Sequence, residues 1–177
     1  NDLQKLLKNR ENPQKPRSVI LGAGGAARAV TYALINAGWD VTLATRAADI
    51  PQAKALIADF TTQKPKYAEK LSNTELNATS LSPLLSFLSL IVNATPVGMK
   101  SHYAGTPWLK NFPFPETALL YDLIYPPAQT QLIQDAAQAG LPTRNGLGML
   151  IEQALLSFEI WTGKKIPADK IILKSDK

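Results

Sequence analysis

The stretch that most constrains the fold runs from Ser18 to Val30 and reads SVILGAGGAARAV. Its three consecutive large apolar residues are typical of a parallel strand that is covered on both faces. The glycines that follow predict a tight turn, and apolar residues then recur at the spacing of one helix face. We expect that buried face to hold Ala26, Ala29, Val30, Ala33, Leu34 and Ala37, with Gly38 closing the helix. A strand, a tight turn and a helix in this order begin a βαβ unit.

The rest of the chain alternates between predicted strands and predicted helices. Strands are expected at residues 40–45, 89–94 and 117–124, with a short additional strand near 67–71. Helices are expected at residues 50–60, 129–139 and 145–163, the first of them with Asp49 as its N-cap. This alternation favours an α/β fold with a doubly wound, Rossmann-like parallel sheet and a C-terminal helical extension.

Composition narrows the class of protein. The 177 residues include no cysteine, which removes disulfides, thiolate chemistry and cysteine-ligated zinc and fits a reducing, cytoplasmic location. No apolar run approaches the roughly 20 residues that a membrane span needs, so we expect no membrane association. The net charge of +5 favours anionic partners, but the basic residues are scattered along the chain rather than gathered in one stripe. We therefore expect no nucleic-acid partner, and no metal site is predicted.

The glycine-rich turn predicts a dinucleotide site. Gly22, Gly24 and Ala27 fit the pattern G-x-G-x-x-G/A, in which the first glycine allows the turn and the second lets a pyrophosphate approach the backbone. The start of the helix then offers free N–H groups to the phosphates. The alternative is a glycine turn that is only structural, but its place between a strand and a helix favours the dinucleotide.

The end of the second predicted strand indicates which dinucleotide. An NAD site usually has a carboxylate there for the ribose hydroxyls, whereas this chain has Thr45 and Arg46. A guanidinium can pair with the 2′-phosphate of NADP, which a carboxylate would repel. We predict NADP as the cofactor; the alternative is an arginine that is merely exposed to solvent.

Three further motifs carry a family resemblance. IVNATPVGM begins at Ile91, YDLIYPPAQTQLI at Tyr121 and NGLGMLIEQALLSFEIWTG at Asn145. In this order they resemble the carboxyl-terminal half of shikimate dehydrogenase and its quinate-using relatives, and the resemblance runs from about Arg17 to Gly163.

The resemblance implies a role for particular residues. The pyrophosphate would be held by Gly22, Gly24, Gly25 and Ala26, and the 2′-phosphate would lie at Thr45 and Arg46. The adenosine side would be lined by Asn93, Ala94 and Thr95, the nicotinamide side by Leu123 and Gly146, and the hydroxy-acid ring would be reached by Tyr125 and Gln153. The family's Asn-Arg-Thr triplet for the 2′-phosphate is here Thr45-Arg46-Ala47, so only the arginine is kept. From the residues alone, Tyr125 could equally be a packed aromatic, and Gln153 could make a bond between helices.

The resemblance also implies three regions and a reaction. Residues 1–16 would be the end of an interdomain helix and a linker, 17–144 the NADP-binding domain, and 145–177 helices that pack toward an amino-terminal substrate domain. The long helix has two apolar stripes, and its second partner could be the other edge of the sheet, a symmetry mate or that missing domain. Because the chain begins at Asn1 within what reads as a helix, we expect it to be a fragment.

The expected reaction is the reversible, NADPH-dependent reduction of 3-dehydroshikimate to shikimate. The family's catalytic lysine and aspartate belong to the missing part, so no catalytic residue is predicted in this chain, and Lys100, His102 and Asp122 are not substitutes. The fragment alone is expected to bind NADP without turnover. The alternatives are a non-catalytic module that senses quinate or shikimate, and a dehydrogenase of the same fold that uses quinate or another small polar substrate.

Overall fold

The computed structural model describes residues 15–99 and 104–167. The helix end expected within residues 1–16, as well as Lys100 and His102, lies outside these ranges. In chain order the elements are β1 (Arg17–Leu21), α2 (Gly25–Asn36), β2 (Asp40–Thr45), the 3₁₀ helix η1 (Ala47–Asp49), α3 (Ile50–Gln63), η2 (Pro65–Tyr67), β3 (Leu71–Glu75), α4 (Ala78–Leu81), η3 (Ser82–Phe87), β4 (Leu88–Asn93), β5 (Leu119–Asp122), α5 (Gln131–Gln138), β6 (Thr143–Arg144) and α6 (Leu147–Thr162).

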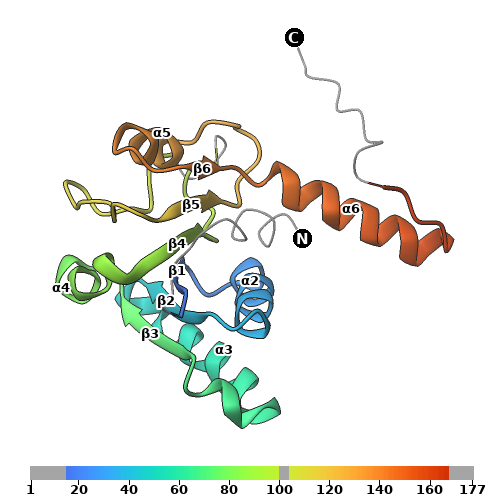
Figure 1. Ribbon diagram of the computed structural model, residues 1–177, viewed down its shortest axis with the longest axis horizontal. Helices are drawn as coiled ribbons and strands as arrows, with labels where there is room; N and C mark the ends of the chain where they lie inside the picture. Colours follow the sequence, from blue (N-terminus) through green and yellow to red (C-terminus); the bar gives the residue numbers. More distant parts are fainter. Residues whose placement is uncertain (1–14, 100–103, 168–177) are drawn as a thin grey trace.

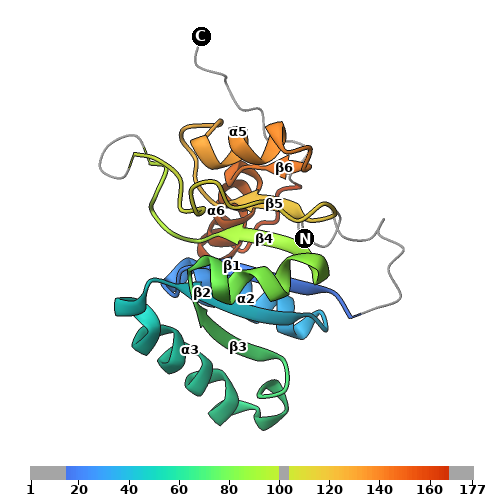
Figure 2. The same ribbon diagram turned by 90° about the vertical axis from the view of Figure 1, so that its left-hand side faces the viewer.

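The strands form one six-stranded sheet in the order β3-β2-β1-β4-β5-β6, and every neighbouring pair is parallel. Figure 2 shows the strands stacked in this order. The chain order reverses between β1 and β4, and open α/β sheets bind ligands beyond the carboxyl ends of strands at such a point. The predicted doubly wound, Rossmann-like sheet is confirmed.

Apolar layers cover both faces of the sheet. Helices α2 and α3 lie on one side, and α4 and α5 lie on the other (Figure 1). In β1, Ile20 belongs to the core under α2 and α3, whereas Val19 and Leu21 belong to the opposite core, and all three are fully buried. The uninterrupted apolar run of β1 therefore reflects its central position.

The buried face of α2 differs from the predicted one. Its buried residues are Ala27, Val30, Thr31, Leu34 and Ile35, whereas the predicted Ala26, Ala29, Ala33 and Ala37 are exposed. The helix is turned by about one residue because burying Ile35 beside Leu34 removes more apolar area from water than burying alanines would. Gly38 follows the C-cap Ala37 with φ +91°, as expected of a glycine that closes a helix.

Several other strands and helices begin or end at residues that differ from the predicted ones. The third strand is β3, at Leu71–Glu75, whereas Tyr67 lies in η2, where its hydroxyl donates to Asn36 Oδ1 over 2.6 Å. Strand β5 is shorter than predicted, and α5 begins after Thr130, whose hydroxyl accepts from the N–H of Ile133. Asp49 stands at the N-cap position of α3 but makes no capping hydrogen bond through its side chain.

Helix α6 projects from the end of the sheet where β5 and β6 lie (Figure 1). No residue of α6 is fully buried in the described part of the chain, although its Met149 packs, partly buried, against the core under α2 and α3. Its most exposed large side chains are Trp161, Ile160, Leu156 and Leu150, at 81%, 80%, 57% and 49%. The helix therefore presents a large apolar surface.

Candidate functional site

The glycine-rich turn lies at the carboxyl end of β1, between β2 and β4. The N–H of Gly22 donates to the carbonyl oxygen of Ala44 over 2.9 Å, and the N–H of Ala94 donates to that of Leu21 over 3.0 Å. Gly22 has φ +100°, and a Cβ there would lie 3.1 Å from Cγ2 of Thr95. Both the backbone angle and the close approach of Thr95 therefore require glycine.

The start of α2 is suited to an anion. Gly24 is its N-cap, no side chain caps it, and no acidic residue stands in its first turn. A Cβ built on Gly24 or on Gly25 would meet nothing within 4 Å, so the backbone there is open. The first N–H groups of the helix and its positive dipole end are thus available to a phosphate, and these residues fit a pyrophosphate.

Asn93, the last residue of β4, fixes the loop that follows it. Its Oδ1 accepts from the N–H and the hydroxyl of Thr95 over 3.0 and 2.7 Å. Its Nδ2 donates to Oδ1 of Asp122 over 2.9 Å and to the carbonyl oxygen of Val97 over 3.3 Å. Asn93 is fully buried, so its side chain orders Ala94 and Thr95 from beneath rather than facing the open edge.

Asp122, the last residue of β5, is the second buried polar group of this edge. Besides the bond from Asn93, its carboxylate accepts from the N–H of Ile124 over 3.1 Å and from the hydroxyl of Thr130 over 2.6 Å. Burial raises the pKa of Asp122 above its ordinary value of 3.8, and these hydrogen bonds offset part of that rise. The carboxylate therefore joins the loops after β4 and β5 to the start of α5.

A pocket of about 190 Å³ opens where α6 meets the turn after β5. It is lined by Ala26, Leu123, Tyr125, Gly146, Met149, Leu150 and Gln153. A Cβ on Gly146 would overlap the carbonyl oxygen of Leu123, so only glycine allows α6 to begin this close to the strand end. The structure thus brings together five residues that the sequence singled out, from α2, the loop after β5 and α6.

Sequence reasoning missed Met149 and Leu150 as part of this pocket. Each of them belongs to one of the two apolar stripes of α6. Their position one helical turn before Gln153 could have indicated that they line the same pocket. Asp122 was set aside as a catalytic group, which its complete burial supports, but its structural role depends on contacts that only the fold shows.

Thr45 is the last residue of β2, and Arg46 follows it as the N-cap of η1. Thr45 is 3% exposed, and its hydroxyl is one of two buried side-chain polar atoms without a hydrogen-bond partner in the described part of the chain. Arg46 is 80% exposed and forms an ion pair of 2.7 Å with Asp49. An exposed guanidinium at this strand end fits a 2′-phosphate, whereas the buried Thr45 hydroxyl faces inward.

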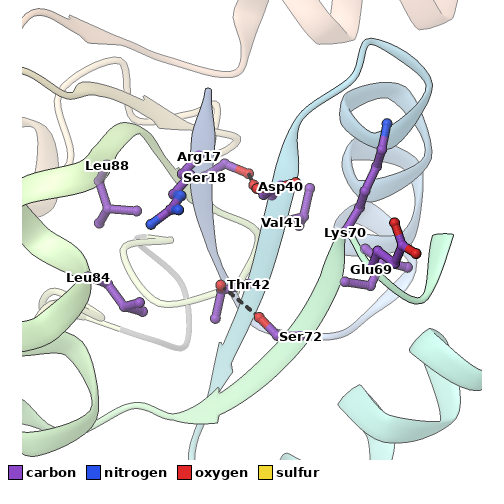
Figure 3. A pocket seen from close by; sticks show the side chains of 11 residues that line it. Arg17, Ser18, Asp40, Val41, Thr42, Glu69, Lys70, Ser72, Leu84 and Leu88 are labelled. Atoms are coloured by element: carbon purple, nitrogen blue, oxygen red, sulfur yellow. Dashed lines mark hydrogen bonds between the residues drawn. The ribbon is translucent and has the colours of Figure 1, made fainter. Parts of the chain in front are cut away.

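A second pocket, of about 240 Å³, lies at the other edge of the sheet, where β1, β2 and β3 begin (Figure 3). Its hydroxyl groups are hydrogen-bonded within the chain: the Thr42 and Ser72 hydroxyls lie 2.9 Å apart, and the Ser18 hydroxyl donates to the carbonyl oxygen of Asp40 over 3.3 Å. The Arg17 guanidinium stacks over the Phe87 ring at 5.0 Å. Because ligands of such sheets bind at the carboxyl ends of strands, the first pocket is the candidate site.

Among the described residues, no helix is long and apolar enough to cross a membrane. No group of three or more histidine or acidic side chains in this part of the chain is placed to hold a metal ion.

The glycine turn, the strand order and the pocket define a Rossmann-like domain of the dehydrogenase type. A family model described as the Shikimate 5′-dehydrogenase C-terminal domain matches residues 146–172. A shikimate dehydrogenase (NADP(+)) of Methanopyrus kandleri is 36% identical over 159 residues, which are 89% of this chain and 53% of that protein. The chain thus spans about half the length of the curated relatives it matches.

Solved structures agree with these matches. Quinate dehydrogenase from Corynebacterium glutamicum in complex with NAD superposes with a TM-score of 0.75 at 28% identity, covering 90% of this chain and 54% of that one. Shikimate 5-dehydrogenase from Thermus thermophilus in complex with NADP(H) and shikimate superposes with a TM-score of 0.71 at 32% identity, covering 94% and 57%. In sequence and in fold, the chain is similar to shikimate dehydrogenases and corresponds to the carboxyl-terminal domain of those proteins.

Proposed function

We propose that this chain binds NADP along the carboxyl edge of its sheet and forms half of the active site of a shikimate dehydrogenase. The reaction is the reversible, NADPH-dependent reduction of 3-dehydroshikimate to shikimate. The observation that carries the proposal is the pocket in which Ala26, Leu123, Tyr125, Gly146 and Gln153 meet beside the glycine turn. Relatives named shikimate dehydrogenase (NADP(+)) support it.

The cofactor would lie across four strand ends. In this proposal Gly22, Gly24, Gly25 and Ala26 hold the pyrophosphate, Thr45 and Arg46 flank the adenosine ribose, Ala94 and Thr95 line the adenosine side, held in place by Asn93, and Leu123 and Gly146 border the nicotinamide. When bound, the nicotinamide would supply the hydride chemistry, and the contribution of Leu123 and Gly146 would be to hold its ring against the pocket. The close contact of Gly146 with Leu123 brings the start of α6 next to the end of β5, on the side of the pocket where the nicotinamide would lie.

The substrate would meet the cofactor at Tyr125 and Gln153. Both side chains line the pocket, Tyr125 is 42% exposed, and a phenol and an amide are suited to the hydroxyl and carboxylate groups of a small hydroxy acid. We propose that the catalytic lysine and aspartate come from an amino-terminal substrate domain. The proposed regions are therefore 1–16 as the interdomain helix and linker, 17–144 as the NADP-binding domain, and 145–177 as helices that pack toward that domain.

The exposed apolar surface of α6 supports this arrangement. A helix whose Trp161 and Ile160 are about four-fifths exposed is expected to bury these side chains against another protein surface. The pocket lies on the same helix, so a domain that covers α6 would also close over Tyr125 and Gln153. A cytoplasmic location would fit such a biosynthetic enzyme.

A quinate dehydrogenase is the second candidate. Its specific support is the superposition with the quinate dehydrogenase bound to NAD, together with the absence of the asparagine and threonine that would flank Arg46. Shikimate and quinate differ at the ring carbon that bears the carboxylate, which carries a hydroxyl in quinate and belongs to a double bond in shikimate, so the choice between them falls to residues of the complete substrate site.

Binding titrations test the proposal directly. We expect NADP⁺ to bind the full chain more tightly than NAD⁺, and Arg46→Ala to remove this preference because the 2′-phosphate loses its guanidinium. Lys66→Ala, which removes an exposed cation from η2, is the control and should leave both affinities unchanged. Absence of NADP⁺ binding, or an unchanged preference in Arg46→Ala, would refute the cofactor assignment.

A turnover assay tests whether catalysis requires the amino-terminal domain in addition to this chain. The chain alone is expected to form no NADPH from shikimate, whereas the protein extended by the amino-terminal domain should do so. A panel of shikimate and quinate with the extended protein separates the two candidate activities.

A further inference from the structure

We propose that Asp49 is a specificity-determining residue, whose carboxylate competes with the 2′-phosphate of NADP for Arg46 and thereby lowers the preference for NADP over NAD. The inference rests on the proposed function of Arg46 as the ligand of the 2′-phosphate. It concerns a contact within the chain that the family resemblance did not predict.

The contact occupies one edge of the guanidinium. Nε of Arg46 donates to Oδ2 of Asp49 over 2.7 Å, and a terminal guanidinium nitrogen lies 2.7 Å from the same oxygen. Two N–H groups that point in nearly the same direction are what a phosphate uses when it binds arginine in fork geometry. A 2′-phosphate that takes this edge must therefore displace the carboxylate.

The local backbone places the two side chains together. Residues Ala47–Asp49 form the 3₁₀ helix η1, and the N–H of Asp49 donates to the carbonyl oxygen of Arg46 over 2.9 Å. This turn holds the carboxylate three residues beyond the arginine, on the same side. The Asp49 side chain is 34% exposed, whereas that of Arg46 is 80% exposed. The carboxylate therefore lies against the protein surface, and the guanidinium extends into solvent.

The carboxylate is directed to Arg46 although a helix start is next to it. Asp49 is the N-cap residue of α3, a position at which aspartate commonly accepts from the helix N–H groups, but it makes no such hydrogen bond here. Its side-chain hydrogen bond goes to the guanidinium instead. The same carboxylate would also lie near a bound 2′-phosphate, and two negative groups side by side repel each other.

NAD is affected differently because it carries a hydroxyl in place of the phosphate. Its binding needs no guanidinium, and its neutral ribose is not repelled by Asp49. Since exposed ion pairs are weak, we expect about a three- to tenfold effect on NADP⁺ affinity and less than about a twofold effect on NAD⁺ affinity. Asp49 thus tunes the ratio of the two affinities rather than deciding binding outright.

The experiment measures the dissociation constants of NADP⁺ and NAD⁺ for the full chain and for Asp49→Asn, which keeps the size and the capping ability of the side chain and removes its charge. We expect NADP⁺ to bind about three- to tenfold more tightly and the gain to shrink in about 0.5 M salt, where surface charges are screened. Asp49→Ser, a second neutral N-cap residue, should give the same result and guards against a folding defect of one variant.

Asp59→Asn is the matched control. Asp59 lies in α3, the helix that Asp49 precedes, and also forms an exposed ion pair with an arginine, Arg28, at 2.6 Å. Loss of its charge is expected to leave the ratio of the two affinities within about twofold. In an Arg46→Ala background, Asp49→Asn should have a clearly smaller effect on NADP⁺ affinity, because the competition for the guanidinium is gone and only the repulsion between the carboxylate and the 2′-phosphate is left to relieve.

The outcomes separate the two proposals. If Arg46→Ala abolishes the preference for NADP⁺ but Asp49→Asn leaves it unchanged, competition by Asp49 is wrong while the cofactor assignment stands. If Asp59→Asn raises the preference as much as Asp49→Asn does, the effect is one of net charge, and the inference fails. If the wild-type chain shows no preference that depends on Arg46, both proposals fail.

Discussion

The buried carboxylate of Asp122 allows a quantitative test of how the candidate site is built. It accepts hydrogen bonds from Asn93, Ile124 and Thr130, and it is fully buried. Asp122→Ala removes the acceptor of all three donors, although Asn93 keeps its bond to Val97. A buried donor without a partner costs about 1–3 kcal/mol, and removal of a desolvated carboxylate returns part of that. We expect a net loss of about 2–4 kcal/mol in the free energy of unfolding.

Asp122→Asn is the matched variant. Its carbonyl oxygen can accept from Asn93 and Ile124, and its amide can donate to the Thr130 hydroxyl, which already accepts from the N–H of Ile133. The Asn93 amide and the Ile124 N–H therefore keep their acceptor, and only the Thr130 hydroxyl hydrogen loses its own. Because the cost of burying a charge disappears at the same time, we expect a net change within about 1 kcal/mol at neutral pH. The pair of variants separates the hydrogen bonds from the charge.

Urea unfolding followed by tryptophan fluorescence measures both variants, since Trp39 and Trp108 are buried and report on the two cores. With a slope of about 2 kcal/mol per molar urea, Asp122→Ala should lower the midpoint by about 1–2 M, and Asp122→Asn by less than about 0.5 M. Equal midpoints for the two variants would refute the reasoning, because they would show that the hydrogen bonds contribute nothing.

The same pair tests the sign of the pKa shift. Burial raises the pKa of Asp122 above 3.8, so the folded state holds the proton more tightly than the unfolded state does. The stability that this provides is complete below pH 3.8 and is lost as the pH rises through the raised pKa. We therefore expect the wild-type chain to lose stability relative to Asp122→Asn across that window, and a difference that is constant or of opposite sign would contradict the assignment.

Three further changes probe the pocket and α6. Gly146→Ala should cost about 2–3 kcal/mol in urea unfolding, since its Cβ would overlap the Leu123 carbonyl oxygen, whereas Gly25→Ala, with open space around its Cβ, should cost less than about 0.5 kcal/mol. In the extended protein, Gln153→Leu should raise the KM for shikimate about tenfold without changing the NADP⁺ dissociation constant, because one charge-assisted hydrogen bond is lost; an equal effect on both would place Gln153 elsewhere. Trp161→Ala should leave the stability of this chain within about 0.5 kcal/mol but weaken its association with a separately supplied amino-terminal domain, and unchanged association would argue against α6 as the contact surface.

The sequence predicted those parts of the fold that depend on long apolar runs. Strands β1, β2 and β4 are almost wholly buried, so their residues carry a strong hydrophobic signal. Strand β3 was misplaced because it lies at the edge of the sheet, and only Leu71 of its five residues is buried. The two-residue strand β6 was not predicted, since so short a segment has no periodicity. The face of α2 was misjudged because alanines recur on one side while Thr31 and Ile35 fill the other.

In the candidate site, too, some features could be predicted from the sequence and others could not. The glycine turn was recognisable because backbone angles restrict which residues can stand there, and Gly146 was recognised only through the family resemblance, although its contact with Leu123 explains why glycine is required. The bonds of Asp122 and the pairing of Arg46 with Asp49 could not be predicted. The first joins residues that are distant in the sequence, and the second places at the arginine a carboxylate that the sequence favoured as a helix cap.

The contact between Asn93 and Asp122 determines the shape of the site, whereas the contact between Arg46 and Asp49 affects its selectivity for the cofactor. The Asn93 and Asp122 side chains are fully buried, so their hydrogen bonds are costly to break, and they fix the loops after β4 and β5. Arg46 and Asp49 lie at the surface, where an ion pair is weak and sensitive to salt. Substitutions at the buried pair should therefore change stability and binding of both dinucleotides together, whereas substitutions at the exposed pair should change the ratio of the two affinities and leave unfolding almost unaffected. The choice of cofactor can then vary at residues 45–49 without rebuilding the edge of the sheet that holds it.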